Sequence, residues 1–149
     1  MEPVKKLDVL VAFRLNDVNI TENGKLRHKA MSSRYKGLFN VSYATKFDKW
    51  KFDVTLQLNG PSRLPDTQKM PESLRRPSSS PVYPQLLGQV TRKFKYFEVY
   101  IGGENLTNFK QEDPITEYDR PYHTHFDTSM VWGPIVGATV YGGLRYSIK

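Results

Sequence analysis

Hydrophobic and polar residues alternate strictly along parts of this chain. The clearest stretch is WKFDVTLQLN, residues 50–59, in which every second residue from Trp50 to Leu58 is apolar and every residue between them is polar. Successive side chains of an extended strand point to opposite faces, so this period of two predicts a β-strand with one apolar and one polar face. The spacing of three and four residues that marks an amphipathic helix is not sustained anywhere in the sequence.

The same alternation recurs in five other stretches and defines the predicted fold. Strands are expected at approximately residues 6–20, 34–47, 49–60, 82–93, 96–106 and 135–148. Such strands exceed the ~5–6 residues common in soluble sheets and match the ~9–11 residues of a tilted membrane-spanning strand. The predicted fold class is therefore all-β: an antiparallel up-and-down meander of about six long strands, forming an incomplete segment of a transmembrane β-barrel.

The connections between these strands alternate in length. Residues 46–49 and 93–96 form short turns, whereas the connections at about 21–33, 61–81 and 107–134 are long and polar, with many prolines and glycines. Outer-membrane barrels show this asymmetry, with tight periplasmic turns and large external loops. Aromatic residues gather beside the short turns, and we expect them to form one girdle at the membrane interface. They are Phe47, Trp50, Phe94, Tyr96, Phe97 and Tyr146.

The polar side of each predicted strand would line the lumen of such a barrel. The residues expected to face the lumen are Arg14, Lys36, Lys51, Asp53, Gln57, Gln89, Glu98, Glu104 and Arg145. Charged groups there can stay hydrated or pair with a domain that fills the barrel. They could contact such a domain or line a substrate path, but a wet interior by itself also requires polar side chains.

Composition and charge narrow the functions that remain. The 149 residues suffice for one domain, and the net charge of +7 would suit an anionic partner. The cations are scattered rather than grouped on a basic helix, which argues against nucleic acid as a partner. The absence of cysteine excludes disulfides, thiolate metal sites and cysteine nucleophiles. No apolar run approaches the ~20 residues of a membrane-spanning helix.

A soluble β-protein is the alternative to the membrane barrel. The apolar fraction of 38% and the mean hydropathy of −0.57 are low for a packed globule, but half-buried strands of a soluble meander or sandwich also alternate. A soluble, basic, β-rich binding module therefore stays open as the second hypothesis.

Catalytic and cofactor signals are weak. His123 and His125 lie on one side of an extended segment with Asp119 and Asp127 nearby, and could in principle bind zinc or copper. No spacing fixes a third ligand, so exposed loop histidines are the preferred interpretation and a metal-dependent hydrolase is a third hypothesis. We expect no enzymatic activity and no cofactor.

Ligand contacts are expected from the long loops at 61–81 and 107–134 rather than from the strands. The loop at 107–134 carries residues that could stack on a sugar or a chelate or bind it through charge. These candidates are Tyr118, Arg120, Tyr122 and Trp132. Their types indicate no particular ligand.

The second half of the chain resembles a known family. FEVYIGGENLTNFKQEDPI, residues 97–115, and FDTSMVWGPIVGATVYGGLRYSIK, residues 126–149, are similar to the C-terminal end of TonB-dependent receptors of the Bacteroidetes type. In that family a strand ending in GxENLTN rises to a long external loop, a SMVWGP segment leads back, and a Y-x-GLRY strand closes the barrel. The match is residue by residue over 102–108 and 129–146, with Ala138 where a basic residue is common. Residues 40–60 and 63–67 resemble the preceding strands.

The resemblance implies an energy-coupled importer of the outer membrane. Such receptors have a barrel of about twenty-two strands around an N-terminal plug. They bind an iron complex, a vitamin or a glycan, and contact an energy-transducing inner-membrane complex through an N-terminal box. The present chain resembles only the last quarter of that barrel and lacks the plug and the box, so we expect a fragment. Its expected partners are outer-membrane lipid and the rest of the barrel and plug, and the inner-membrane complex only through the missing N-terminal part.

Overall fold

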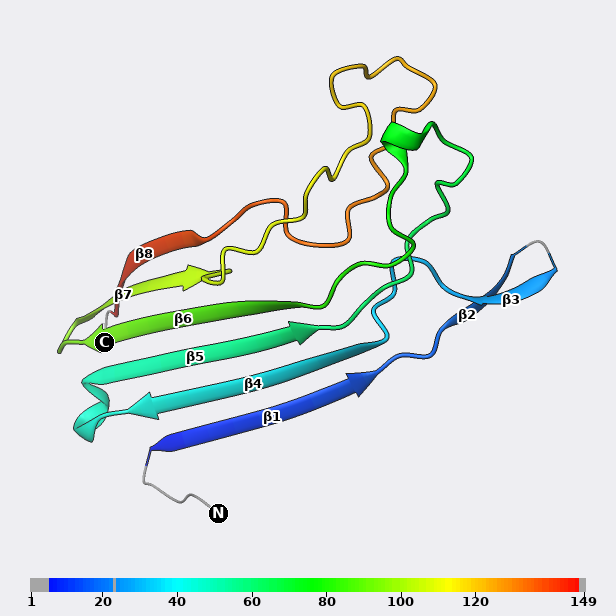
Figure 1. Cartoon of the computed structure of the whole chain (residues 1–149). Coiled ribbons are helices and arrows are strands. Elements are labelled where there is room, and N and C mark those ends of the chain that lie inside the picture. Colours follow the sequence, from blue (N-terminus) through cyan, green and yellow to red (C-terminus); the bar gives the residue numbers. More distant parts are fainter. Residues whose placement is uncertain (1–5, 23, 148–149) are drawn as a thin grey trace.

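The computed structural model describes residues 6–22 and 24–147, and within these it is an all-β structure with one large antiparallel sheet (Figure 1). The sheet has six strands, which are neighbours in chain order. They are β1 (Leu7–Leu15), β4 (Tyr35–Ala44), β5 (Trp50–Asn59), β6 (Tyr83–Lys93), β7 (Phe97–Glu104) and β8 (Thr139–Tyr146). The predicted all-β class and the antiparallel meander of six strands are confirmed.

The remaining regular elements are short. A separate hairpin consists of β2 (Asn19–Glu22) and β3 (Lys25–His28), and single 3-10 turns occur at η1 (Lys46–Asp48) and η2 (Glu72–Leu74). No helix among the described residues has the length and apolar character needed to cross a membrane.

The strand bounds differ from the predicted ranges at three places. β1 ends at Leu15 rather than near residue 20, and a predicted loop region holds the β2–β3 hairpin, whose turn includes Gly24 at φ +73°. β8 begins at Thr139 rather than at 135, because the Asn108 carboxamide oxygen accepts a hydrogen bond from the Ala138 backbone at 3.1 Å and holds the chain before the strand. The predicted end of this last strand, at position 148, lies outside the described residues.

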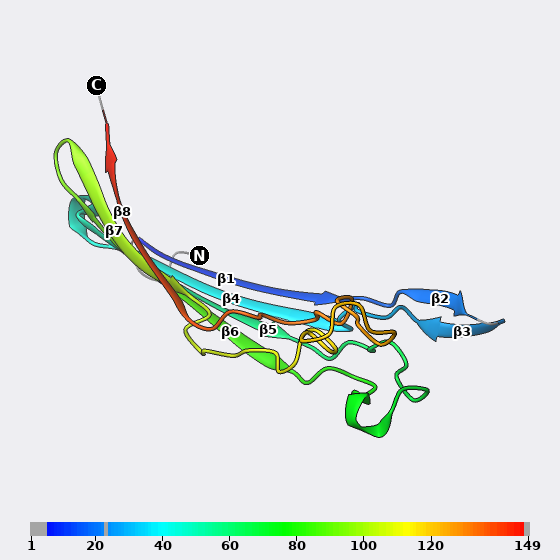
Figure 2. The same cartoon turned by 90° about the horizontal axis from the view of Figure 1, so that it is seen from above.

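The sheet is open. β1 pairs only with β4 and β8 only with β7, so that both outer edges have no strand partner among residues 6–22 and 24–147. The short turns lie at one end of the strands and the long connections at the other (Figure 1). Seen from above, β7 and β8 turn away from the direction of β1 at the short-turn end, as expected of a twisted sheet (Figure 2).

The strand register separates apolar and polar side chains onto two faces. One row of paired residues crosses the whole sheet on the apolar face: Val9, Val41, Val54, Gly88, Gly103 and Val140. The neighbouring row, on the polar face, consists of Asp8, Ser42, Asp53, Gln89, Gly102 and Tyr141. The period of two in the sequence is therefore kept in register over all six strands.

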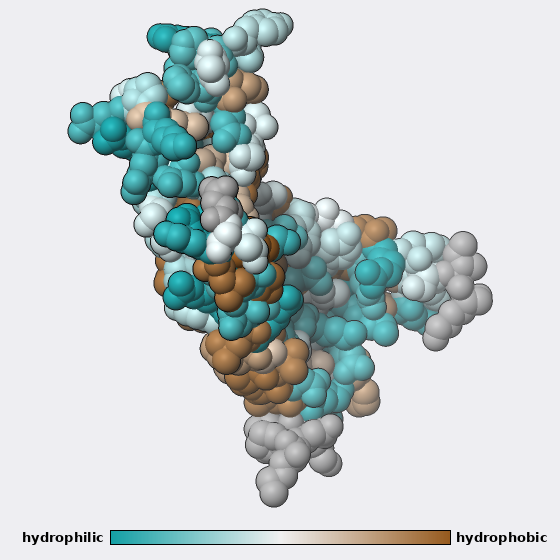
Figure 3. All heavy atoms as spheres, turned by 90° about the vertical axis from the view of Figure 1, so that its right-hand side faces the viewer, coloured by the Kyte–Doolittle hydropathy of each residue, from teal (hydrophilic) through white to brown (hydrophobic). Residues whose placement is uncertain are grey.

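Burial is inverted relative to an ordinary soluble sheet. On β5 the apolar side chains of Val54, Leu56 and Leu58 are 48%, 41% and 41% exposed, whereas the polar residues Asp53 and Gln57 are half-buried. The buried hydrophobic residues of the described chain are only Leu64, Tyr83 and Met130, and all three lie at the long-loop end. In Figure 3, seen from that end, hydrophilic residues cover the upper loops and hydrophobic residues gather lower down. The sheet has no packed core on its apolar face.

Candidate functional site

The polar face of the sheet collects all nine residues that the sequence predicted to face a lumen. Their register places them on one side of the sheet, together with the row from Asp8 to Tyr141. The face is cross-linked by side chains: the Ser42 hydroxyl donates to Asp53 at 2.6 Å, and the Tyr141 hydroxyl donates to the Gln89 side-chain carboxamide oxygen at 3.1 Å. These bonds join strands β4 with β5 and β6 with β8. The polar face is therefore a connected surface rather than a set of isolated groups.

Charge on this face is distributed unevenly along the strands. Near the short turns, Glu98 lies 3.3 Å from the Arg145 guanidinium and 3.8 Å from the Lys93 ammonium. Toward the long loops, Arg14 on β1 and Lys36 on β4 are directly paired in register, and Arg14 donates to Asn16 at 2.7 Å. At the first end one carboxylate is paired with two cations, whereas at the second end two cations lie side by side.

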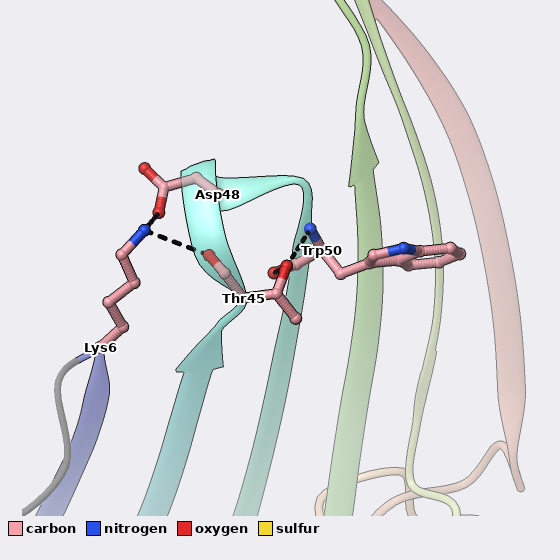
Figure 4. Close-up of polar contacts among 4 residues, drawn as sticks. All are labelled: Lys6, Thr45, Asp48 and Trp50. Carbon is pink, nitrogen blue, oxygen red and sulfur yellow. Dashed lines mark hydrogen bonds and ion pairs between the residues drawn. The ribbon is translucent and has the colours of Figure 1, made fainter.

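The turn between β4 and β5 is fixed by side-chain contacts (Figure 4). The Lys6 ammonium lies 2.7 Å from Asp48 and donates to the Thr45 carbonyl at 3.1 Å, and the Trp50 backbone N–H donates to the Thr45 hydroxyl at 3.0 Å. Lys6 holds the pKa of Asp48 below its ordinary value of 3.8, first through the hydrogen bond that its ammonium donates to the Asp48 carboxylate and then through its positive charge. Phe47 lies in this turn at φ 61°, and the residue is 77% exposed.

The six aromatic residues predicted as a girdle are all exposed at the short-turn end. Phe94 and Phe97 stack with ring centroids 4.5 Å apart, and the Arg92 guanidinium lies 4.7 Å from the Trp50 ring and 5.0 Å from the Phe94 ring. Arg92 is the only charged residue on the apolar face of the described strands. Its charge is placed among aromatic faces, which favours a site between an apolar and an aqueous phase.

At the opposite end, the connection between β7 and β8 packs against the first residue of β6 in an aromatic cluster. Tyr83 stacks on Phe109 with ring centroids 4.6 Å apart, and Trp132 lies tilted against both rings. The buried Gln111 carboxamide donates to the Met130 carbonyl at 2.7 Å and accepts from the backbone N–H of Trp132 at 2.8 Å. This cluster and its glutamine hold the returning half of the 107–134 loop in place.

The GENLTN stretch has a local structural role. Asn105, at φ 50°, donates from its carboxamide to the backbone carbonyls of Phe109 at 2.7 Å and Val136 at 3.1 Å. The Thr107 hydroxyl donates to the Pro84 carbonyl at 2.9 Å. Asparagine tolerates this left-handed conformation better than most residues. The motif ends β7 and ties the loop to its return.

The predicted ligand residues of the 107–134 loop differ in their surroundings. Tyr118 and Tyr122 are exposed, and Arg120 lies 3.6 Å from its neighbour Asp119. Trp132 is instead half-buried in the aromatic cluster.

The two candidate metal-binding histidines lie near each other, with ring centroids 5.6 Å apart. The Nδ1 atom of His123 contacts the Glu117 carboxylate, a partner that the sequence did not indicate, whereas Asp127 accepts a hydrogen bond from the Ser129 backbone. Among the described residues no three His, Asp or Glu side chains are arranged to hold a metal ion.

One cavity lies partly on the 61–81 connection, from which ligand contacts were expected, but its arginines were not predicted. It lies between the β2–β3 hairpin and the connection from β5 to β6, and its lining includes Arg27, Arg34, Arg63 and Arg76. These four residues are spread over fifty positions of the chain, counting from 27 to 76, and so produce no local charge run. Only the fold brings them together.

Comparison of the chain with protein-family models, curated proteins and solved structures gives no match.

Proposed function

We propose that this chain is the C-terminal β-barrel segment of a Bacteroidetes-type TonB-dependent outer-membrane receptor, a transport protein without enzymatic activity. The observation that carries the proposal is the exposed apolar face, which crosses all six strands in register. In water a face of this kind must be covered by protein, because apolar surface is driven out of contact with water. A bilayer covers it directly.

The open edges fit the same proposal. An unpaired strand edge in hydrocarbon leaves backbone N–H and C=O groups without partners, which a bilayer does not tolerate. The outer edges of β1 and β8 would therefore pair with the other strands of the receptor barrel. The polar face would then line the lumen and contact the plug, and the plug region would carry the contact with the inner-membrane energy-transducing complex.

The distribution of turns and aromatic residues supports an orientation. The short turns and the exposed aromatic residues would lie at the periplasmic interface, and the long connections with their packed aromatic cluster would lie outside the cell. The cargo is a nutrient of the classes such receptors take up, an iron complex, a vitamin or a glycan.

Envelope fractionation of cells that naturally produce the protein tests this function. An antibody against the 107–134 loop should detect it in the outer-membrane fraction, in a polypeptide well above 17.2 kDa, and protease added to intact cells should remove the signal. A signal in the soluble fraction would contradict the proposal and favour the soluble basic binding module instead.

A further inference from the structure

The arginine-lined cavity at the long-loop end is built from three separate segments. Arg27 lies on β3, Arg34 directly precedes β4, and Arg63 and Arg76 lie between β5 and β6. The cavity volume is about 610 Å³, which is within the range of small-molecule sites. Among the described residues, Asp66 is the one acidic residue of its lining. Four arginines and one acidic residue therefore line the cavity.

Two of the four arginines are held in place by other groups. The Arg63 guanidinium lies 2.8 Å from Glu22 and donates to the His28 carbonyl at 3.0 Å, and the Arg76 guanidinium lies 3.1 Å from Asp113. These bonds connect the β2–β3 hairpin and the 107–134 loop to the cavity wall. The site is therefore positioned by contacts from both neighbouring connections.

The other two arginines are available. The side chains of Arg27 and Arg34 form no ion pair or hydrogen bond with any described residue, and both residues are exposed. The one acidic group of the wall is partly engaged, because the Asp66 carboxylate accepts a hydrogen bond from the Gln68 backbone at 3.0 Å. The positive charge of the cavity is therefore not neutralised from within the described chain.

Arg76 at the cavity wall has a buried N–H group without a partner in the described part of the chain. The Nε atom of Arg76 is buried and has no hydrogen-bond partner among the described residues. Buried N–H groups are nearly always hydrogen-bonded, and one without an acceptor carries a desolvation cost that no hydrogen bond offsets. An anionic oxygen in the cavity would suit the planar guanidinium donors of its lining.

A second cavity adjoins the first and extends the site. It has a volume of about 360 Å³, shares Leu64, Arg76 and Ser79 with the arginine-lined cavity, and is also lined by Phe109 and Trp132. An aromatic wall next to a cationic one suits a ligand that combines acidic groups with a ring or sugar body.

We infer that the arginine-lined cavity binds a small ligand bearing carboxylate, sulfate or phosphate groups. That this ligand is the transported nutrient rests on the proposed function, and it would make the nutrient an anionic one. That the cavity binds an anion does not depend on the proposed function.

Calorimetric titration of the full purified chain in detergent tests the inference. The probes are citrate, inorganic phosphate, and a sulfated disaccharide beside its unsulfated form. The R27Q/R34Q double variant removes the two unpaired cations, and K25Q/K69Q, two exposed lysines outside the cavity lining, removes the same charge as a matched control. At least one anionic probe should bind, its affinity should fall about tenfold or more in R27Q/R34Q, and K25Q/K69Q should bind as the unmodified chain does.

Equal losses in the two double variants would assign the binding to net charge and overturn the inference, as would the absence of binding by every anionic probe or equal binding of the unsulfated sugar. Circular dichroism of each variant verifies that the sheet is intact. Among the anionic probes, the one that binds most tightly distinguishes carboxylate, phosphate and sulfate as the natural group. If the chain fractionates as soluble and binds an anion, the proposed function is refuted and the anion site is supported. If the chain lies in the outer membrane and binds none of the probes, the anion site is refuted and the proposed function is supported.

Discussion

Gln111 is the residue on which the order of the longest loop depends most directly. It is 6% exposed, and its carboxamide bonds to the backbone at Met130, Trp132 and Gly133. We predict that Gln111→Met, which keeps the side-chain length but makes none of these bonds, destabilises the loop by about 1–3 kcal/mol, because buried backbone groups are left unpaired. Limited proteolysis should then cleave the 107–134 loop about tenfold faster, since cleavage follows the population of the opened loop.

The exposed glutamine of the neighbouring connection provides the control for this variant. Gln68→Met changes the same group in a side chain that is exposed, and the cleavage rate of the 107–134 loop should stay as in the unmodified chain. Equal cleavage rates in the Gln111 and Gln68 variants would mean that the three hydrogen bonds do not hold the loop. Nothing in the local sequence marks Gln111, because its partners lie some twenty residues away and are backbone groups.

The pairing of β7 with β8 depends on glycines that make room for tyrosine rings. Gly102 lies opposite Tyr141 in the register, and a Cβ atom at Gly102 would come within 2.6 Å of the Tyr141 ring and 2.9 Å of the Gly88 carbonyl oxygen. We predict that Gly102→Ala lowers the free energy of unfolding by about 1–3 kcal/mol, because the added methyl group overpacks the contact. Denaturant unfolding in micelles, followed by tryptophan fluorescence, measures the change.

A strand glycine with free space beside it is the matched control. At Gly37 on β4 the nearest atom to an added Cβ is the Leu58 Cβ at 3.7 Å, an ordinary contact. Gly37→Ala should raise the free energy of unfolding by about 0.5–1 kcal/mol, because alanine loses less backbone entropy than glycine on folding. If both alanine variants stabilise the sheet, the tyrosine ring does not occupy the place that the Gly102 contact assigns to it.

The long strands could be predicted from the sequence, whereas other elements could not. The period of two indicated the six long strands and their faces, because side-chain direction along a strand is a local property. The β2–β3 hairpin was not predicted: its strands have four residues each and few apolar ones, so that the Asn23-Gly24 pair was the main sign of the turn. The arginine-lined cavity and the Tyr83, Phe109 and Trp132 cluster lie beyond such prediction, since they join residues far apart in the sequence.

At the scale of the whole molecule, the question is what covers the apolar face. Val54 and Thr55 are adjacent on the central strand β5 and lie on opposite faces, with Val54 48% exposed and Thr55 half-buried. Because the chain contains no cysteine, each of the variants Val54→Cys and Thr55→Cys has a single labelling site. The site lies on the apolar face in the first variant and on the polar face in the second. The two variants therefore differ only in the face that carries the label.

We predict that a polarity-sensitive fluorophore at position 54, in protein reconstituted into bilayers, emits as in hydrocarbon and is quenched by a lipid-borne quencher. The same fluorophore at position 55 should respond to aqueous iodide instead, because the polar face would border a wet lumen. Iodide quenching at both positions would place the apolar face in water and refute the membrane assignment. Shielding of position 54 from both quenchers would show that protein covers this face, as the soluble module requires, because a face packed against another sheet is accessible neither to lipid nor to water.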